Sequence, residues 1–235
     1  YKYVYPFLKK KNISGSFYPA VESSLHKTIL YVHKLQFIFE KVYDRRLLLS
    51  EILKMIELKG IKVDNILTIQ KKLSKTSDLR FNDNNTNIIR NLLQYILPLE
   101  LSNSIKDQLF KKYVNTNNKT FMKDLYLSKK DIKEMIENGM HFGSHGNKHV
   151  WLEYLDKKQQ YSEISISKKF LIDNGVDGNY LSICYPFGSY NKTTIDVLKK
   201  LNFKVGYTTS DTKVKSPYKN LSLPRYDTND FKNFY

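Results

Sequence analysis

The sequence contains a single cysteine and no long uncharged apolar run. Cys184 is the only cysteine among the 235 residues, which excludes an intrachain disulfide framework and a zinc site built from several cysteines. The sequence has no uncharged stretch of about 18 apolar residues, so no membrane-spanning helix is predicted. Aromatic residues make up 14% of the chain, which excludes intrinsic disorder as a description of the whole chain.

Acidic residues are also few. Asp and Glu number 23 against 39 Lys and Arg, which gives a net charge of +16. Such a charge suits nucleic acid, anionic lipid or an acidic polysaccharide. The lysines are scattered over the whole chain, however, and no nucleic-acid-binding module is recognisable. We therefore expect no nucleic-acid partner; a steep salt dependence of affinity for nucleic acid would contradict this.

The chain is predicted to divide into three stretches. Residues 1–22 begin with an amphipathic helix that ends at Lys9–Lys11, followed by a buried strand over 15–20. Residues 23–125 are predicted to be a helical insertion, in which amphipathic spacing indicates helices at 46–59, 88–97 and 105–113. The stretch 82–87 is rich in Asn, Asp and Thr, and it is predicted to be a turn between helices.

Residues 126–235 show a regular alternation of helix and strand. Ser128 is followed three residues later by Asp131, the pattern of a capping box. The elements expected after this point are helices over 128–139, 152–174 and 193–201 and strands over 140–144, 180–185, 203–209 and 221–225. This order predicts an α/β fold with parallel strands joined by right-handed crossovers. In such folds the chemistry lies where the strands end.

Two histidines follow the strand 140–144. His145 and His149 are four positions apart, and Gly146 and Asn147 between them favour a turn that brings both rings to one point. Two imidazoles with one carboxylate form a zinc site that keeps a coordination position open for water. The alternative is that both are surface histidines in a loop.

Two further strand ends carry candidate residues. Tyr185, Pro186, Phe187 and Gly188 follow the strand 180–185; this loop presents aromatic rings that suit the apolar face of a sugar, or it is an ordinary strand-terminating turn. Arg225 ends the last strand. It either anchors a nearby carboxylate or is a solvated charge.

Taken together, these segments resemble the polysaccharide deacetylase family, the fourth family of carbohydrate esterases, with its nodulation-type deacetylase domain. The resemblance rests on residues 139–149, Glu163-Ile164, Ser167-Lys168, 185–190, Thr208-Thr209 and 223–225, and on residues 1–19. It implies a distorted (β/α) barrel with a divalent metal, usually zinc, held by one aspartate and two histidines. The resemblance implies that His145 and His149 are the two histidine ligands. It also implies that the loop 185–187 forms a wall of the substrate groove and supplies a backbone N–H donor to the developing oxyanion.

The chain departs from the family pattern at several points. The Asp-Asp pair that supplies the base and the third ligand should precede Tyr1 and is not in the sequence, so we expect a barrel incomplete at its N-terminal strand. The 235 residues by themselves are therefore expected to be inactive or nearly so. Cys184 stands where the family often has the arginine that orients the base, and we expect Arg225 to take over this role from another strand.

The family's late histidine has no counterpart after His149. His26, His33 and His141 are other histidines in the chain, and we assign none of them as the general acid.

The leading hypothesis is a metal-dependent hydrolase that removes an N-acetyl or similar acyl group from a sugar of a polysaccharide or surface-glycan precursor. The alternative is a carbohydrate-binding pseudoenzyme of the same fold. The expected partner is an N-acetylated carbohydrate, and the insertion could pair two copies in a homo-oligomer. The compartment is cytoplasmic or envelope-associated, with the cytoplasm favoured.

Overall fold

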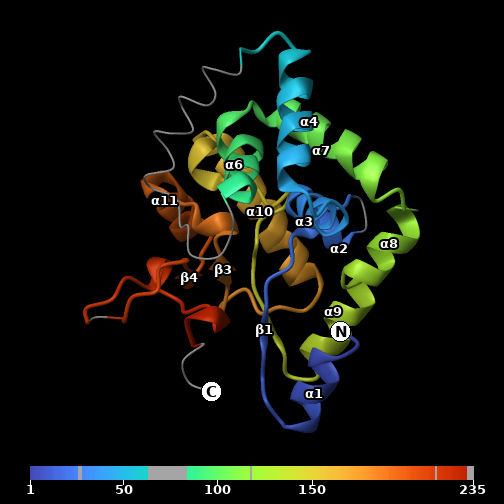
Figure 1. Cartoon of the computed structure of the whole chain (residues 1–235). Helices are drawn as coiled ribbons and strands as arrows, with labels where there is room; N and C mark the ends of the chain where they lie inside the picture. The colour runs from blue at the N-terminus through green and yellow to red at the C-terminus, as the bar shows by residue number, and fades with distance from the viewer. Residues whose placement is uncertain (26–27, 63–83, 117, 215, 232–235) are drawn as a thin grey trace. The chain divides into compact units, whose positions relative to one another are not determined.

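The computed structural model describes residues 1–25, 28–62, 84–116, 118–214 and 216–231. The chain divides into two compact units, Tyr1–Thr28 with Asn118–Tyr235, and Ile29–Asn117 (Figure 1). The sequence placed the corresponding boundaries at 22/23 and 125/126. That the middle stretch is an insertion stays a prediction, because compactness alone does not distinguish an insertion from any other second unit.

The first unit is built on short parallel strands. β1 (Ser16–Phe17) pairs with β2 (His141–Phe142), and β3 (Ser182–Cys184) pairs with β4 (Val205–Tyr207). Two isolated parallel bridges add to these pairs: Ser144, just after β2, pairs with Ile183 of β3, and Tyr207 of β4 pairs with Leu223. The strands therefore follow one another side by side in chain order.

Helices connect these strands. α9 (Lys129–Glu137) precedes β2, α10 (Lys157–Asp173) joins β2 to β3, and α11 (Lys192–Lys200) joins β3 to β4. The predicted capping box of Ser128 and Asp131 is confirmed: Ser128 Oγ accepts from the Asp131 N–H, and the Asp131 carboxylate accepts from the Ser128 N–H. Apolar side chains of the three helices pack against the strands in one core; its members include Ile132, Phe142, Ile164, Ile183 and Val197.

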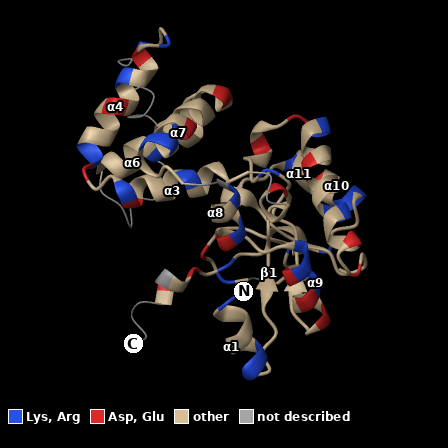
Figure 2. Ribbon diagram, turned by 90° about the vertical axis from the view of Figure 1, so that its right-hand side faces the viewer, with Lys and Arg blue, Asp and Glu red and all other residues tan. Residues whose placement is uncertain are grey.

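Shorter helices complete the first unit: α1 (Val4–Lys10), α2 (Val21–Ser24) and α8 (Asn118–Leu125), with 3-10 turns at Leu152–Tyr154, Pro186–Gly188, Asn220–Ser222 and Thr228–Phe231. Both basic and acidic residues occur on α9, α10 and α11, as the blue and red segments of the ribbon show (Figure 2). Over the described residues, no helix is long and apolar enough to cross a membrane.

Three sequence predictions for this unit are wrong in detail. The segment 15–20 is not a buried strand, since β1 has two residues and Ser16 is exposed. The helix expected over 152–174 begins only at Lys157, because the Asp156 side chain caps it there in a second capping box, with Gln159. Residues 221–225 do not form a strand; a 3-10 turn occupies part of this stretch, and only Leu223 makes a bridge.

The predicted α/β class with parallel strands is confirmed. The strands that the structure describes do not close on themselves, so the incomplete (β/α) barrel stays a prediction.

The second unit is helical throughout its described residues. It contains α3 (Tyr31–Lys41), α4 (Arg45–Glu57), α6 (Asn84–Asn91), a π-helical turn (Leu92–Ile96) and α7 (Leu99–Tyr113). α4 and α7 agree with the helices predicted at 46–59 and 105–113, although α7 starts earlier, directly after Pro98. Of the turn predicted at 82–87, residues 82–83 lie outside the described residues, and residues 84–87 form the start of α6 instead. α3 was not predicted.

Candidate functional site

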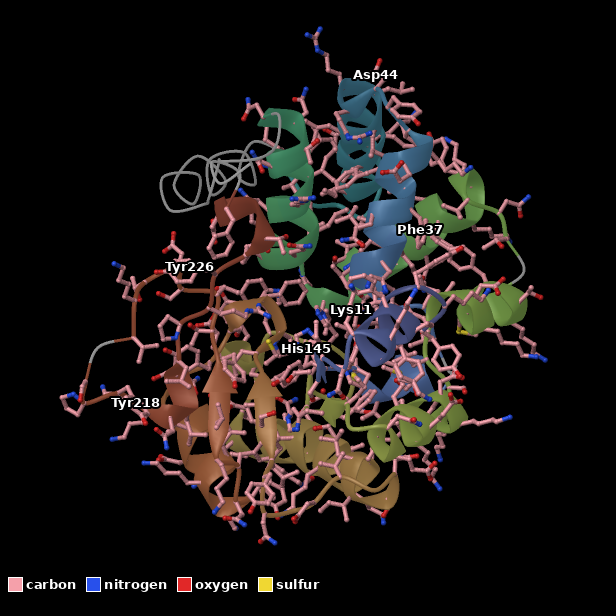
Figure 3. The ribbon with its side chains drawn as sticks, turned by 90° about the horizontal axis from the view of Figure 1, so that it is seen from below. Lys11, Phe37, Asp44, His145, Tyr218 and Tyr226 are labelled. Atoms are coloured by element: carbon pink, nitrogen blue, oxygen red, sulfur yellow. The ribbon has the colours of Figure 1, made fainter. Side chains whose placement is uncertain are left out.

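His145 lies directly beyond the paired part of β2, near the end of β3 (Figure 3). Its Nδ1 is 2.6 Å from the carbonyl oxygen of Cys184. A carbonyl oxygen only accepts, so Nδ1–H is the donor, and the neutral ring then carries its lone pair on Nε2. A backbone carbonyl that fixes the tautomer and orientation in this way is the usual second partner of a metal-binding histidine.

His149 comes close to His145, as the turn between them predicts. The two ring centroids are 4.6 Å apart, and the rings are inclined at 74°. His149 has φ of 57°, in the left-handed region that non-glycine residues rarely adopt. Phe187 also has φ of 57°, and its ring lies 4.6 Å from that of His149. Such backbone conformations cost about 1–3 kcal/mol each and cluster at functional sites.

The loop between the two histidines is held by side chains of its own strand and of α10. Gly146 N–H donates to Ser144 Oγ at 3.2 Å. The N–H groups of Asn147 and Lys148 both donate to Glu163 Oε2, at 3.0 and 2.9 Å. All three backbone donors of the loop are therefore satisfied by side-chain oxygens.

Only part of the loop 185–188 is accessible, although all four residues were expected to contact the substrate. Tyr185 is 1% exposed, its ring is stacked on Tyr190 at 4.7 Å, and its hydroxyl donates to the Leu221 carbonyl. Burial raises the pKa of Tyr185. Pro186 is also buried, whereas Phe187 and Gly188 are partly exposed. Any aromatic surface of this loop therefore comes from Phe187.

Trp151 extends this aromatic surface. Its ring is stacked on Phe187, with centroids 4.5 Å apart and an angle of 3° between the planes. Trp151 was not among the predicted site residues, although it is the only tryptophan of the sequence and stands two residues after His149.

A second cluster of polar side chains lies nearer the N-terminal ends of β2 and β3. His141 Nε2 is 2.8 Å and the Tyr18 hydroxyl 3.1 Å from Ser182 Oγ. Burial lowers the pKa of His141 and raises that of Tyr18, so burial favours the neutral form of each. Both hydrogen bonds end on a hydroxyl of β3, which ties β1, β2 and β3 together.

The remaining candidates are placed as follows. Arg225 is exposed, its backbone N–H donates to Ser210 O, and its charge lowers the pKa of Cys184 against the larger, opposite effect of burial. His33 belongs to α3 of the second unit, and His26 lies outside the described residues. Within the described ranges, no three His, Cys, Asp or Glu side chains gather closely enough to hold a metal ion.

The family follows from comparison with known proteins. A sequence profile described as polysaccharide deacetylase matches residues 70–206, more than half of the chain. The chain belongs to the polysaccharide deacetylase family. The match includes the segment from His145 to Gly188, and it begins within the stretch 23–125 that was expected to lie outside the resemblance.

Individual relatives cover smaller parts. YxkH of Bacillus subtilis (strain 168), named as a candidate polysaccharide deacetylase, is 37% identical over 84 residues, 36% of this chain and 30% of that protein. The match therefore spans less than a third of this curated relative.

Solved structures of deacetylases are also similar. The deacetylase PplD of Streptococcus pyogenes, solved in complex with acetate, is 36% identical with a TM-score of 0.40, over 42% of this chain and 43% of that one. The BpsB deacetylase domain of Bordetella bronchiseptica is 10% identical with a TM-score of 0.48, over 96% of this chain and 65% of that one.

Proposed function

We propose that this chain is part of a divalent-metal-dependent hydrolase that removes an N-acetyl or similar acyl group from a sugar of a polysaccharide or surface-glycan precursor. The observation that carries the proposal is the His145–His149 pair, with ring centroids 4.6 Å apart in a chain of the polysaccharide deacetylase family. Zinc is the proposed metal, because imidazole is among its preferred ligands.

The two histidines fit part of a zinc site. His145 would bind through Nε2, because its Nδ1–H donates to the Cys184 carbonyl. His149 would supply the second imidazole. A third protein ligand would be a carboxylate from outside the described residues, since catalytic zinc sites use three protein ligands. The metal, when bound, supplies Lewis acidity toward the acyl carbonyl and toward a water molecule.

The loop after β3 would bind the sugar and the acyl oxygen. The N–H groups of Tyr185 and Gly188 donate to Tyr207 O and Tyr185 O, and proline has none. The N–H of Phe187 is therefore the proposed donor to the oxygen of the acyl group. The stacked rings of Phe187 and Trp151 would contact the apolar face of the sugar.

Zinc titration of the chain and its histidine variants tests the metal site. The 235 residues should bind one zinc ion saturably but weakly, and either His145→Ala or His149→Ala should raise the dissociation constant by about 10-fold or more. His33→Ala on α3 is the matched control and should leave the zinc affinity unchanged. Binding that is absent, or that is indifferent to both substitutions, would overturn the metal site.

Acetate release from N-acetylglucosamine oligosaccharides tests the reaction. We expect little or no release from the 235 residues by themselves, and restored release when the chain carries an Asp-Asp segment before Tyr1. Full activity of the 235 residues would contradict the expectation that the base and the third ligand are supplied from there.

The alternative is carbohydrate binding without hydrolysis, and the stacked Trp151–Phe187 pair favours it. It predicts oligosaccharide binding that Trp151→Ala abolishes and His145→Ala leaves intact, with no acetate released by any form of the chain. The hydrolase proposal predicts acetate release from the chain that carries the Asp-Asp segment, and His145→Ala should abolish this release.

A further inference from the structure

We infer that Glu163 of α10 is a positioning residue that sets the metal affinity of the His145–His149 pair. The inference rests on the proposed function, since it assumes that these two histidines bind the metal. Glu163 touches neither histidine in this assignment; it acts through the backbone of the loop that joins them.

Both side-chain hydrogen bonds that Glu163 makes with the described residues go to this loop. Oε2 accepts from the N–H groups of Asn147 and Lys148, the two residues directly before His149. The side chain is buried, with 9% of the residue exposed. Hydrogen bonds from N–H groups to an ionised carboxylate are about twice as strong as those between neutral groups. Two of them therefore fix the approach of the chain to His149.

Gly146 provides the turn that the loop makes before these two donors. Its φ is +74°, in the left-handed region that favours glycine. The turn directs the N–H groups of the next two residues toward Glu163 of α10.

A second residue of α10 and the start of α2 hold the same loop. The hydroxyls of Ser144 and Ser167 are 2.5 Å apart, so α10 reaches the loop at a second point one turn beyond Glu163. On the other side, the carbonyls of Gly146 and Asn147 accept from the first N–H groups of α2, those of Val21 and Glu22. The loop is thus fixed from both α10 and α2 within the first unit.

This arrangement affects metal affinity because His149 has an unfavourable backbone conformation, with φ of 57°. Without its anchors the loop would leave this conformation, and metal binding would have to restore it. Part of the binding free energy would then be spent on ordering the loop. Loss of groups that orient metal ligands typically lowers metal affinity about 10- to 100-fold.

Substitutions at Glu163 should therefore act in a defined order. Gln keeps an acceptor oxygen at the same reach but loses the charge, so Glu163→Gln should raise the zinc dissociation constant by less than Glu163→Ala. Asp keeps the charge but is shorter by one methylene group and cannot reach both N–H groups. We therefore expect Glu163→Asp to resemble Glu163→Ala, with a rise of about 10- to 100-fold.

The experiment combines zinc titration with hydrogen exchange of the metal-free chain. In Glu163→Ala the amides of residues 146–148 should exchange faster, whereas those of α9 and β3 should keep their protection. Glu137→Gln, an exposed glutamate of α9, is the matched control and should change neither measurement. Ser167→Ala is a second variant that removes the other anchor, and it should weaken zinc binding in the same direction.

The outcomes separate this inference from the proposed function. If the unsubstituted chain binds no zinc, or binds zinc equally well after His145→Ala, the proposed metal site and this inference both fail. If zinc binds and depends on His145, but the three Glu163 variants and Ser167→Ala bind it as tightly as the unsubstituted chain does, only the inference fails. If Glu163→Ala loses protection throughout the first unit and Glu163→Gln binds zinc normally, Glu163 is a stability residue and the inference is wrong.

Discussion

Gly143→Ala is the substitution whose effect can be derived most directly from the structure. Gly143 follows β2 and precedes the candidate site by two residues. A Cβ added there would lie 2.2 Å from Cε1 of Tyr18 and 2.5 Å from Ser182 Oγ. Real Cβ atoms do not approach other atoms so closely, so Tyr18, Ser182 or the strand must move.

None of these movements is free of cost. The Tyr18 hydroxyl is hydrogen-bonded to Ser182 Oγ, which also contacts His141 Nε2. A shift of the tyrosine ring therefore disturbs the group that joins three strands. Overpacking of an interior typically costs about 1–3 kcal/mol. In a protein of this size each kcal/mol lowers the melting temperature by about 2–4 °C, so we expect a decrease of about 2–12 °C.

Gly178→Ala is the matched control. A Cβ at Gly178 would make only ordinary contacts, the nearest at 3.5 Å with Cδ1 of Ile172, and its φ is not in the left-handed region. Because alanine restricts the unfolded chain, this variant should be neutral or more stable by up to about 1 kcal/mol. Melting followed by circular dichroism compares the two. The reasoning is refuted if Gly143→Ala melts no lower than Gly178→Ala.

Three further predictions concern single side chains. Burial lowers the pKa of Lys106 from 10.5 to about 8. Between these two pH values the unfolded chain binds a proton that the folded chain has lost. The free energy of unfolding should therefore rise from about pH 8 to about pH 10.5, by about 3 kcal/mol at most. Lys106→Met should lack this rise in urea unfolding at about pH 7 and about pH 10, and an equal rise in both proteins would contradict it. Asp44 Oδ1 accepts from two N–H groups at the start of α4, so Asp44→Ala should lower the free energy of unfolding by about 1 kcal/mol and Asp44→Asn by much less, as urea titration would measure. Tyr185→Phe removes the hydrogen bond from the tyrosine hydroxyl to the Leu221 carbonyl and should lower the free energy of unfolding by about 1 kcal/mol. An unchanged urea midpoint would rule this out.

Much of the fold could be predicted because the relevant signals lie within a few residues. The capping box at Ser128 and Asp131 starts α9 where expected, and amphipathic spacing located α4. The errors lie where local signals compete. Asp156 was an equally good N-cap inside an apparently continuous helix, and the polar residues 84–87 gave a turn signal in a segment that tertiary packing holds as helix.

The candidate site was predicted only in part. The four-residue spacing of His145 and His149 and the turn residues between them predict that the two rings approach one another, and they do. The burial of Tyr185 was not predictable, because its hydroxyl is held by Leu221, a residue of a distant segment. The stacking of Trp151 on Phe187 likewise joins two loops far apart in the sequence.

The sequence by itself determined the α/β class, the order of helices and strands from α9 to β4 and the positions of the two histidines, because hydrophobic period and capping act over one or two turns of chain. Only the tertiary structure decided which distant groups meet there: the Cys184 carbonyl on His145, Glu163 on the loop, and Phe187 beside His149. These contacts depend on how α10 and the ends of β2 and β3 pack together, and no local pattern encodes that packing.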